Sequence, residues 1–576
     1  MSAFAAGIIS LIFYLITLSP AIRFWDSAEL TAAASVLGIA HSPGFPLYSI
    51  VGRLFVIPGI CSPAIAVNIL SALSAAVAVF LVPLIYREIN SGARLPGALI
   101  AAGLTAFGGR LWMQAVRAEV YAPSFLLLVI ALYLAARYGK SGERRYFFTA
   151  VYVWGLGTAI HTAMSAAFLP PIIWLAFCGS RIKKMGVTSW LIAAALPILA
   201  ATVYLYIPIR GSLDPAVDWG DVSSLRELWW MMSSREFAFT VSFGKWEDFI
   251  ARLVLFWKLF YANFPLFLIF MGLAGIFLVK KKTPMILLFV FGSVISLIRE
   301  ELPHPDHLGY LLPAVLAGSI WTGAAFDRIT GLLERQKWID LGSASRNIII
   351  TALLVFLLFP LTLVQYRNNN FSAGAWAEKM GRGILEPLPE NSIVLMSDIS
   401  SFFICRCLQV VDGIRPDCAV ILPGLLSADS KSRDWYHREL LKKKTIAGLE
   451  GNLPSAEEAI TARIVEANHL NRSVFCEYGK HFRAFAPYLY PAGLVFRMSL
   501  PGDSTSTAAY EYEFPLKREF GDDRGAALAF AARLYSLGLY YSDIGDIDRA
   551  KETFYRAKLT AGNPEELSGT VEPLFR

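Results

Sequence analysis

Long apolar segments recur along most of this chain, and they constrain its fold more than any other feature. Each is close to the roughly 20 residues that an α-helix needs to cross a bilayer. The 576 residues are 55% hydrophobic and only 17% charged, a balance that is unusual for a soluble globular protein. The sequence therefore predicts an α-helical polytopic membrane protein with about eleven spans, at about 4–20, 63–85, 95–108, 119–136, 146–161, 163–178, 188–208, 251–278, 284–299, 308–326 and 347–366.

The distribution of basic residues predicts the orientation of these spans. The first apolar segment has no positive leader and no small-residue cleavage site, so we expect a retained helix rather than a signal peptide. With the N-terminus in the cytoplasm, the inside loops carry the basic residues Arg87, Arg94, Arg137, Lys140, Arg144, Arg145, Lys280, Lys281 and Lys282, as the positive-inside rule requires. In a bacterial inner membrane, the polar loops and the C-terminal region would then lie on the periplasmic side.

The chain becomes more polar after the last apolar segment. We expect a transmembrane domain at 1–366, a soluble α/β domain at 367–520 and a helical segment at 521–576. Ser392–Asp398 and Cys418–Pro423 resemble buried strands with a helix between them. No glycine-rich phosphate loop follows the first strand, so we predict no nucleotide site. We also predict no nucleic-acid partner.

Two features of the C-terminal region leave alternatives open. Gly538, Tyr541, Gly545, Ala550, Phe554 and Ala557 follow the spacing of a tetratricopeptide (TPR) repeat. The spacing predicts a TPR-like helical hairpin that either docks a protein or only packs. Four of the six cysteines also fall in this region, where they form a disulfide or remain buried thiols.

Charged residues gather directly after the first apolar segment. Asp26 and Glu29 are three residues apart and would share one face of a helix, and His41 follows in a loop rich in proline, glycine and aromatic residues. A structural interpretation is an N-terminal capping box formed by Asp26 and Glu29, with Gly38 ending the helix. A functional interpretation is an active site at the membrane surface, because charge at a membrane is costly and usually has a purpose.

The run from Trp25 to Tyr48 also resembles a family signature. It is similar to a group of polytopic membrane proteins long catalogued as a domain of unknown function, assigned to the GT-C class of glycosyltransferases, whose animal member is a protein O-mannosyltransferase. The resemblance covers most of residues 1–425 and continues in Arg117–Ala122, Ala159–His161, Ile207–Gly211, Asp218–Asp221, Tyr310–Ala314 and Gly413–Asp417.

The resemblance implies transfer of a sugar, with mannose as one candidate, from a polyprenyl-phosphate donor to an extracytoplasmic acceptor. A protein Ser/Thr hydroxyl is the favoured acceptor and an envelope glycolipid the alternative. Inverting transfer needs a carboxylate base, and Asp26 matches that position, with Glu29 as second candidate. The expected phosphate and sugar contacts are Arg117, Glu119, Arg210, His41 and His161; for each arginine the alternative is snorkelling to lipid headgroups.

Other classes of protein stay open. A transporter or lipid-linked-sugar flippase would carry ionisable residues near the middle of its spans, whereas here the charges gather at span ends. A non-catalytic assembly protein would use the C-terminal region to bind its partner. His304, Asp306 and His307 lie close in sequence, but we predict no metal and no other cofactor, because a phosphate leaving group does not require one.

Overall fold

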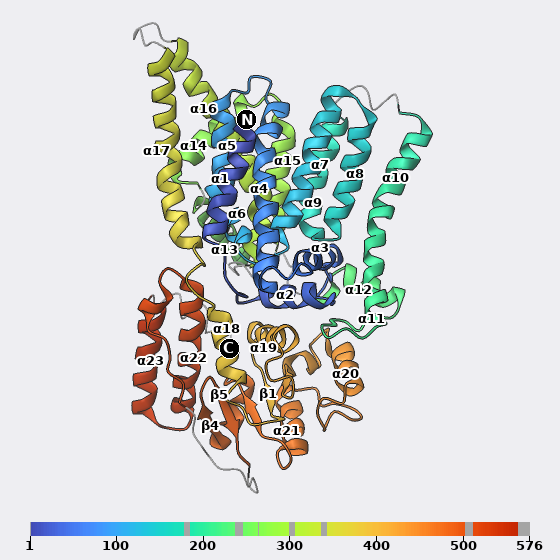
Figure 1. Cartoon of the computed structure of the whole chain (residues 1–576), viewed down its shortest axis with the longest axis vertical. Helices are drawn as coiled ribbons and strands as arrows, with labels where there is room; N and C mark the ends of the chain where they lie inside the picture. Colours follow the sequence, from blue (N-terminus) through green and yellow to red (C-terminus); the bar gives the residue numbers. More distant parts are fainter. Residues whose placement is uncertain are drawn as a thin grey trace.

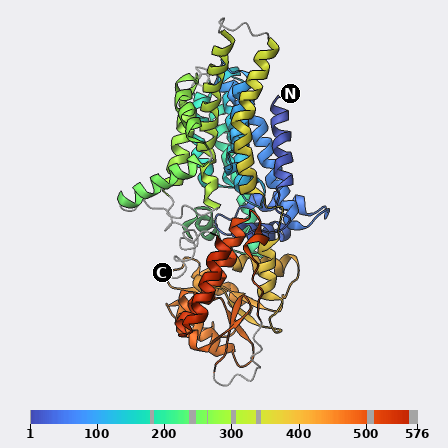
Figure 2. The same ribbon diagram turned by 90° about the vertical axis from the view of Figure 1, so that its left-hand side faces the viewer.

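The computed structural model describes residues 2–177, 185–236, 246–262, 264–298, 306–335, 343–500 and 511–562. A helical bundle lies above a smaller mixed domain, and two helices run beside that domain (Figures 1 and 2). The bundle is built from α1 (Ser2–Ile16), α2 (Asp26–Val36), α3 (Pro46–Val56), α4 (Pro63–Ile89), α5 (Leu95–Phe107), α6 (Arg110–Ala115), α7 (Tyr121–Ser141), α8 (Arg144–Thr158), α9 (Thr162–Phe177), α10 (Val187–Ala201), α11 (Tyr206–Gly211), α12 (Leu225–Met232), α13 (Trp246–Tyr261), α14 (Leu266–Leu278), α15 (Lys282–Leu297), α16 (Leu312–Arg335) and α17 (Ser343–Asn369).

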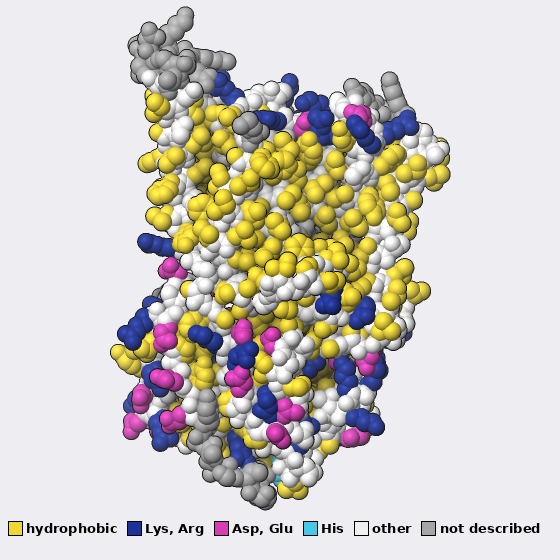
Figure 3. Space-filling view, viewed as in Figure 1, with side chains coloured by type: hydrophobic (Ala, Val, Ile, Leu, Met, Phe, Trp, Pro, Cys, Tyr) yellow, Lys and Arg dark blue, Asp and Glu magenta, His cyan; other side chains and the backbone are white. Residues whose placement is uncertain are grey.

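The outer surface of the bundle is apolar, as an integral membrane protein requires. Among the described residues, five stretches are long and apolar enough to cross a bilayer: 63–89, 121–141, 187–211, 308–332 and 347–369. Phe356 and Phe359 of α17 leave 72% and 63% of their surface exposed, which suits lipid better than water. Figure 3 shows this apolar band, with Lys and Arg side chains along the bundle end that faces away from the mixed domain.

One expected span is wrong. The apolar run at 251–278 is not a single helix, because α13 ends at Tyr261 and α14 begins at Leu266. Pro265 is the residue that precedes α14. A proline has no backbone N–H to donate, and its ring clashes with the preceding turn, so hydropathy alone could not reveal this break.

The mixed domain contains one five-stranded sheet. Its strands are β1 (Ile393–Leu395), β2 (Ala419–Ile421), β3 (Val474–Cys476), β4 (Leu489–Ala492) and β5 (Val495–Met498), in the order β2-β1-β3-β5-β4. β1 pairs in parallel with β2 and β3, whereas β5 pairs antiparallel with β3 and β4. The surrounding helices are α18 (Trp376–Leu385), α19 (Ile399–Val411), α20 (Arg433–Lys442) and α21 (Glu457–Asn468).

The last two described helices form an antiparallel pair. α22 (Arg524–Asp543) and α23 (Ile547–Ala561) pack closely, and a Cβ on Gly538 would lie 2.7 Å from the Phe554 ring. A glycine there therefore lets the two helices approach. The described cysteines, Cys61, Cys405, Cys407, Cys418 and Cys476, are free thiols.

The mixed domain packs directly on the loops of the bundle. One hydrophobic cluster includes Phe24 and Ala28 from the first loop, Trp219 from a later loop, and Phe403 and Val394 from the mixed domain. α2 lies against α19, and α2 and α3 occupy the bundle end that faces this domain (Figure 1). Burial of a shared apolar core therefore fixes the domain next to the first loop.

Candidate active site

The helix that carries Asp26 begins without a side-chain cap. α2 starts at Asp26 itself, and Trp25 precedes it with a φ of 67° and no capping hydrogen bond from its side chain. The Trp25 N–H donates to Ser400 Oγ of α19 across 2.7 Å. The expected capping box of Asp26 and Glu29 is therefore wrong: a contact from the mixed domain sets the backbone just before the helix, and both acids lie inside its first turn.

The end of α2 is held by a second loop. Leu37 adopts the left-handed conformation, and the Gly38 N–H donates to Ala33 O across 2.8 Å. A Cβ on Gly38 would lie 2.7 Å from Val217, so only glycine permits the close approach of the two chains. The Ile39 N–H donates to Val217 O across 2.8 Å, and the Trp219 N–H donates to Ile39 O across 3.0 Å, which brings the 216–219 segment beside the first loop.

Asp26, Glu29 and His41 form one cluster. The His41 N–H donates to Glu29 Oε1 across 2.8 Å, and His41 Nδ1 lies 2.5 Å from Glu29 Oε2. On its other side, His41 Nε2 lies 3.7 Å from Asp26 Oδ2. The Glu29 side chain is 3% exposed and the Asp26 side chain 32%. Glu29 therefore anchors the histidine, whereas Asp26 is the carboxylate that a substrate can reach.

The acids around His41 fix its charge. Burial lowers the pKa of His41, but the nearby carboxylates of Glu29 and Asp26, with a contribution from Glu236, more than offset this and raise it to about 10. His41 is therefore an imidazolium at neutral pH. A positive charge then lies between the two acids of the first loop.

Glu236 is a residue that sequence reasoning missed. This buried carboxylate accepts hydrogen bonds at Oε2 from Ser42 Oγ across 3.0 Å and from Trp219 Nε1 across 2.8 Å. Its Oε1 accepts from Ser432 Oγ of the mixed domain. Glu236 thus links two bundle loops to the mixed domain beside His41 through hydrogen bonds. No local sequence motif around Glu236 predicts these hydrogen bonds.

Arg117 and Glu119 pair with each other inside the protein. They are 5% and 0% exposed, and Arg117 Nη2 lies 3.1 Å from Glu119 Oε1. They lie directly before α7 in the sequence. Burial of this kind does not fit an arginine that snorkels to lipid headgroups, because a snorkelling side chain keeps its charge in water.

Arg210 lies at the C-terminal end of α2. Its Nε donates to Leu37 O across 2.7 Å, and its Nη2 donates to Val36 O across 3.2 Å. These carbonyls have no partner within the helix, and a cation there is favourable to the helix dipole. The structure thus shows Arg210 as a cap of α2, and its contact with phosphate stays a prediction.

His161 lies beside two tyrosine rings. Its ring centroid is 4.9 Å from that of Tyr121 and 5.1 Å from that of Tyr310, and its Nδ1 accepts from the Met164 N–H at the start of α9 across 3.2 Å. His161 is only 8% exposed. The structure therefore joins His161 to the Tyr310 motif.

Within the part of the chain that the structure describes, no group of three or more His, Cys, Asp and Glu residues, the Asp26 cluster included, is arranged so that it could hold a metal ion. His304 and the side chains of Asp306 and His307 lie outside the described residues.

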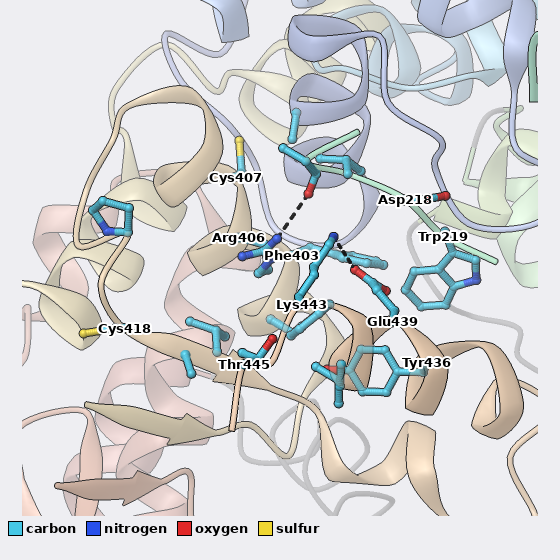
Figure 4. Close-up of a pocket in the computed structure, with 18 of the residues that line it drawn as sticks. Asp218, Trp219, Phe403, Arg406, Cys407, Cys418, Tyr436, Glu439, Lys443 and Thr445 are labelled. Carbon is cyan, nitrogen blue, oxygen red and sulfur yellow. Dashed lines mark hydrogen bonds and ion pairs between the residues drawn. The ribbon is translucent and has the colours of Figure 1, made fainter. Parts of the chain in front are cut away.

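A cavity of about 390 Å³ opens between the loops and the mixed domain. We call it the junction cavity. Glu29 of α2 and the 216–219 segment form one side, and Phe403 and Arg406 of α19 and residues of α20 form the other (Figure 4). Because Glu29 also anchors His41, the junction cavity and the Asp26 cluster share a wall.

Comparisons with known proteins show which proteins this chain is similar to. A family model described as the protein O-mannosyl-transferase TMEM260 N-terminal domain matches residues 26–185. The chain is 24% identical to the protein O-mannosyl-transferase TMEM260 of Mus musculus over 457 residues, and 22% identical to that of Dictyostelium discoideum over 482 residues. These alignments cover 73% and 74% of this chain, but only 62% and 57% of the relatives.

A solved structure shares the fold. ArnT from Cupriavidus metallidurans bound to undecaprenyl phosphate matches with a TM-score of 0.51 and 10% identity, over 87% of this chain and 99% of that one. The family match begins at Asp26, the first residue of α2, and therefore covers the Asp26 cluster and the Arg117–Glu119 pair. In sequence and in fold, the chain resembles the GT-C class of polytopic membrane glycosyltransferases, the group that includes the TMEM260 protein O-mannosyl-transferases.

Proposed function

We propose that this chain is a membrane glycosyltransferase that moves a sugar from a polyprenyl-phosphate donor to a hydroxyl group outside the cytoplasm. The single observation that carries the proposal is the Asp26 cluster, in which one carboxylate is reachable and a second holds the histidine beside it. The named activity of the curated relatives supports sugar transfer, and the undecaprenyl phosphate bound to the ArnT structure supports a lipid-phosphate donor.

In the proposed reaction, Asp26 acts as the general base. It accepts the proton of the acceptor hydroxyl while the hydroxyl oxygen forms a bond to the anomeric carbon of the sugar. The bond between that carbon and the phosphate oxygen breaks, and polyprenyl phosphate leaves with the electron pair. Configuration at the anomeric carbon is inverted, because attack and departure take place on opposite faces of the sugar.

The other residues of the site position the reactants. Glu29 and His41 hold the start of the first loop, and His41 places a positive charge 3.7 Å from the base. Arg117 binds the departing phosphate with Glu119 orienting its guanidinium, which can donate two parallel hydrogen bonds. His161 contacts the sugar or phosphate beside Tyr310, and Arg210 supports the site by capping α2.

The proposal extends to the sugar, the acceptor and the location. Mannose and a protein Ser/Thr hydroxyl are proposed because the curated relatives are named protein O-mannosyl-transferases; an envelope glycolipid is the alternative acceptor. We assign residues 1–366 to catalysis in the membrane, and 367–520 and 521–576 to the outside. For a bacterial chain, the outside is the periplasm.

Replacement of Asp26 tests the reaction. Purified protein is incubated with polyprenyl-phosphate mannose and a peptide acceptor that contains Ser and Thr, and release of polyprenyl phosphate is measured. Asp26→Asn should lower turnover by about 10²–10⁴-fold, which is what loss of a general base costs, while the protein still unfolds cooperatively on heating. Asp214→Asn is the matched control, because Asp214 is exposed and pairs with Lys442 at the surface.

Other outcomes would contradict the assignment. Equal turnover in Asp26→Asn and wild type removes Asp26 as base and makes Glu29 the candidate. Vectorial movement of the donor across a vesicle membrane without release of polyprenyl phosphate would identify a flippase instead.

A further inference from the structure

The junction cavity is lined by residues of the mixed domain and of the bundle end that faces it. Its lining comes from α2, the 216–219 segment, α19, β2, α20 and nearby loops. None of the five candidate membrane spans contributes a residue. Its volume of about 390 Å³ lies within the range of about 300–1,000 Å³ that ligand sites occupy. A ligand therefore reaches the junction cavity from water rather than from the bilayer.

Asp218 is an unusual group to find in such a wall. It lines the junction cavity and is 6% exposed. Its Oδ1 atom is buried, and no donor within the described residues reaches it. A buried carboxylate oxygen without a partner is costly, and a functional site is a common reason for that cost. A bound hydrogen-bond donor would remove it.

The opposite wall supplies hydrogen-bond donors. Arg406 donates to Gln409 Oε1 across 3.1 Å and to Ala216 O across 3.2 Å, so its partners among the described residues engage two of the five N–H groups of its guanidinium. Lys443 points into the same region and pairs with Glu439 (Figure 4). The junction cavity therefore offers both an acceptor and donors, as a polypeptide backbone requires.

Two aromatic rings that line the junction cavity also lie beside His41 of the Asp26 cluster. Phe403 and Trp219 line it, and their centroids lie 6.3 Å and 6.4 Å from that of His41. An extended chain advances about 3.4 Å per residue, so about three residues span the distance from these rings past His41. A ligand that fills the junction cavity and also offers a hydroxyl to Asp26 must be elongated, as a short polypeptide segment is.

We propose that the junction cavity is the acceptor subsite, and that it holds a polypeptide segment beside the Ser or Thr that receives the sugar, with Asp218 accepting a hydrogen bond from that segment. The inference rests on the proposed function. A lipid-linked acceptor would need an apolar path from the bilayer, which the lining does not provide.

The experiment measures peptide binding separately from sugar transfer. The probe is a fluorescent, degenerate heptapeptide mixture with a central Thr, added to the full-length protein in detergent. Asp218→Asn keeps the shape of the side chain but removes its charge, and Ala216→Trp fills the junction cavity from an exposed position. Both should weaken binding of the mixture at least tenfold. Asp221→Asn is the matched control, because Asp221 lies in the same loop but pairs with Arg438 and Lys442, and it should bind as the wild type does.

Each outcome decides one question. Wild-type affinity in a folded Ala216→Trp protein overturns the proposal, even where Asp218→Asn fails to fold. Displacement of the peptides by mannobiose or by a glycolipid would assign the junction cavity to a glycan acceptor instead. Release of polyprenyl phosphate by the wild type is measured in parallel. If the wild type binds the peptides and the variants do not, but the wild type releases no polyprenyl phosphate, the proposed function is contradicted and the peptide site is not.

Discussion

His41 makes the stability of the first loop depend on pH. Its pKa in the folded protein is raised to about 10, because the charges of Glu29 and Asp26 outweigh its burial, whereas the ordinary value is 6.5. A histidine with a raised pKa stabilises the fold fully below pH 6.5, and this contribution is lost as the pH rises towards 10.

The variant His41→Gln keeps a hydrogen-bond donor but cannot carry the charge. We expect it to unfold at a lower temperature than the wild type at pH 6, and we expect this difference to shrink between pH 6.5 and 10. The measurement is the thermal midpoint of both proteins across this range. A difference that stays constant would mean that His41 is neutral in the folded protein.

At the scale of residues, the sequence predicts the shared helix face of Asp26 and Glu29 but not the partners of these acids. Spacing predicts that the two acids lie on one face of a helix, and His41 follows in the next loop, but its contact with Glu29 is visible only in the structure. Glu236 was not predictable, because its partner Ser42 lies 194 residues away in the sequence. The capping box failed for a related reason: Ser400 reaches Trp25 from a distant element, and such tertiary contacts override local signals.

At the scale of elements, a buried ion pair joins the first loop to the last helices. Arg23 donates two hydrogen bonds to the Asp523 carboxylate, one of them across 2.9 Å, and both residues are nearly inaccessible to solvent. Asp523 also caps α22 by accepting from the Ala526 N–H, and the Arg23 guanidinium lies 3.9 Å from the Phe371 ring centroid.

Loss of one partner leaves the other buried without its counter-charge. We expect Asp523→Ala to lower the free energy of unfolding by about 3–5 kcal/mol and to speed hydrogen exchange at the start of α22. Its exposed neighbour offers a matched control, Asp522→Ala, which should change stability by no more than about 0.5 kcal/mol. Equal effects of the two substitutions would show that the pair contributes nothing specific.

The elements themselves were predictable to different degrees. Apolar length identified most of the bundle, because a helix in lipid must satisfy its own backbone. It could not show that α13 and α14 are separate. The pairing of β1 with β3 joins Ile393 to Val474, and a contact between such distant residues leaves no local pattern in the sequence.

At the scale of the whole molecule, the packing of α19 on α2 puts the mixed domain and Asp26 on one side of the membrane. The basic loops lie at the other end of the bundle (Figure 3), so the positive-inside rule predicts that Asp26 is outside.

A protease-sensitive tag inserted after Gly451 should be cleaved from the outside of intact cells or spheroplasts, whereas the same tag after Glu143 should be protected. Both positions lie at the surface. Cleavage only after Glu143 would reverse the orientation and move the proposed reaction to the cytoplasm.

The ion pair between Arg23 and Asp523 also has a consequence for biosynthesis. A ribosome makes Arg23 early and Asp523 500 residues later. Throughout that interval the segment before Asp26 lacks its counter-ion, so an unfinished or truncated chain inserts its helices without completing its first loop. The contact that holds the segment before Asp26 is therefore completed only after the chain has been synthesised as far as the start of α22.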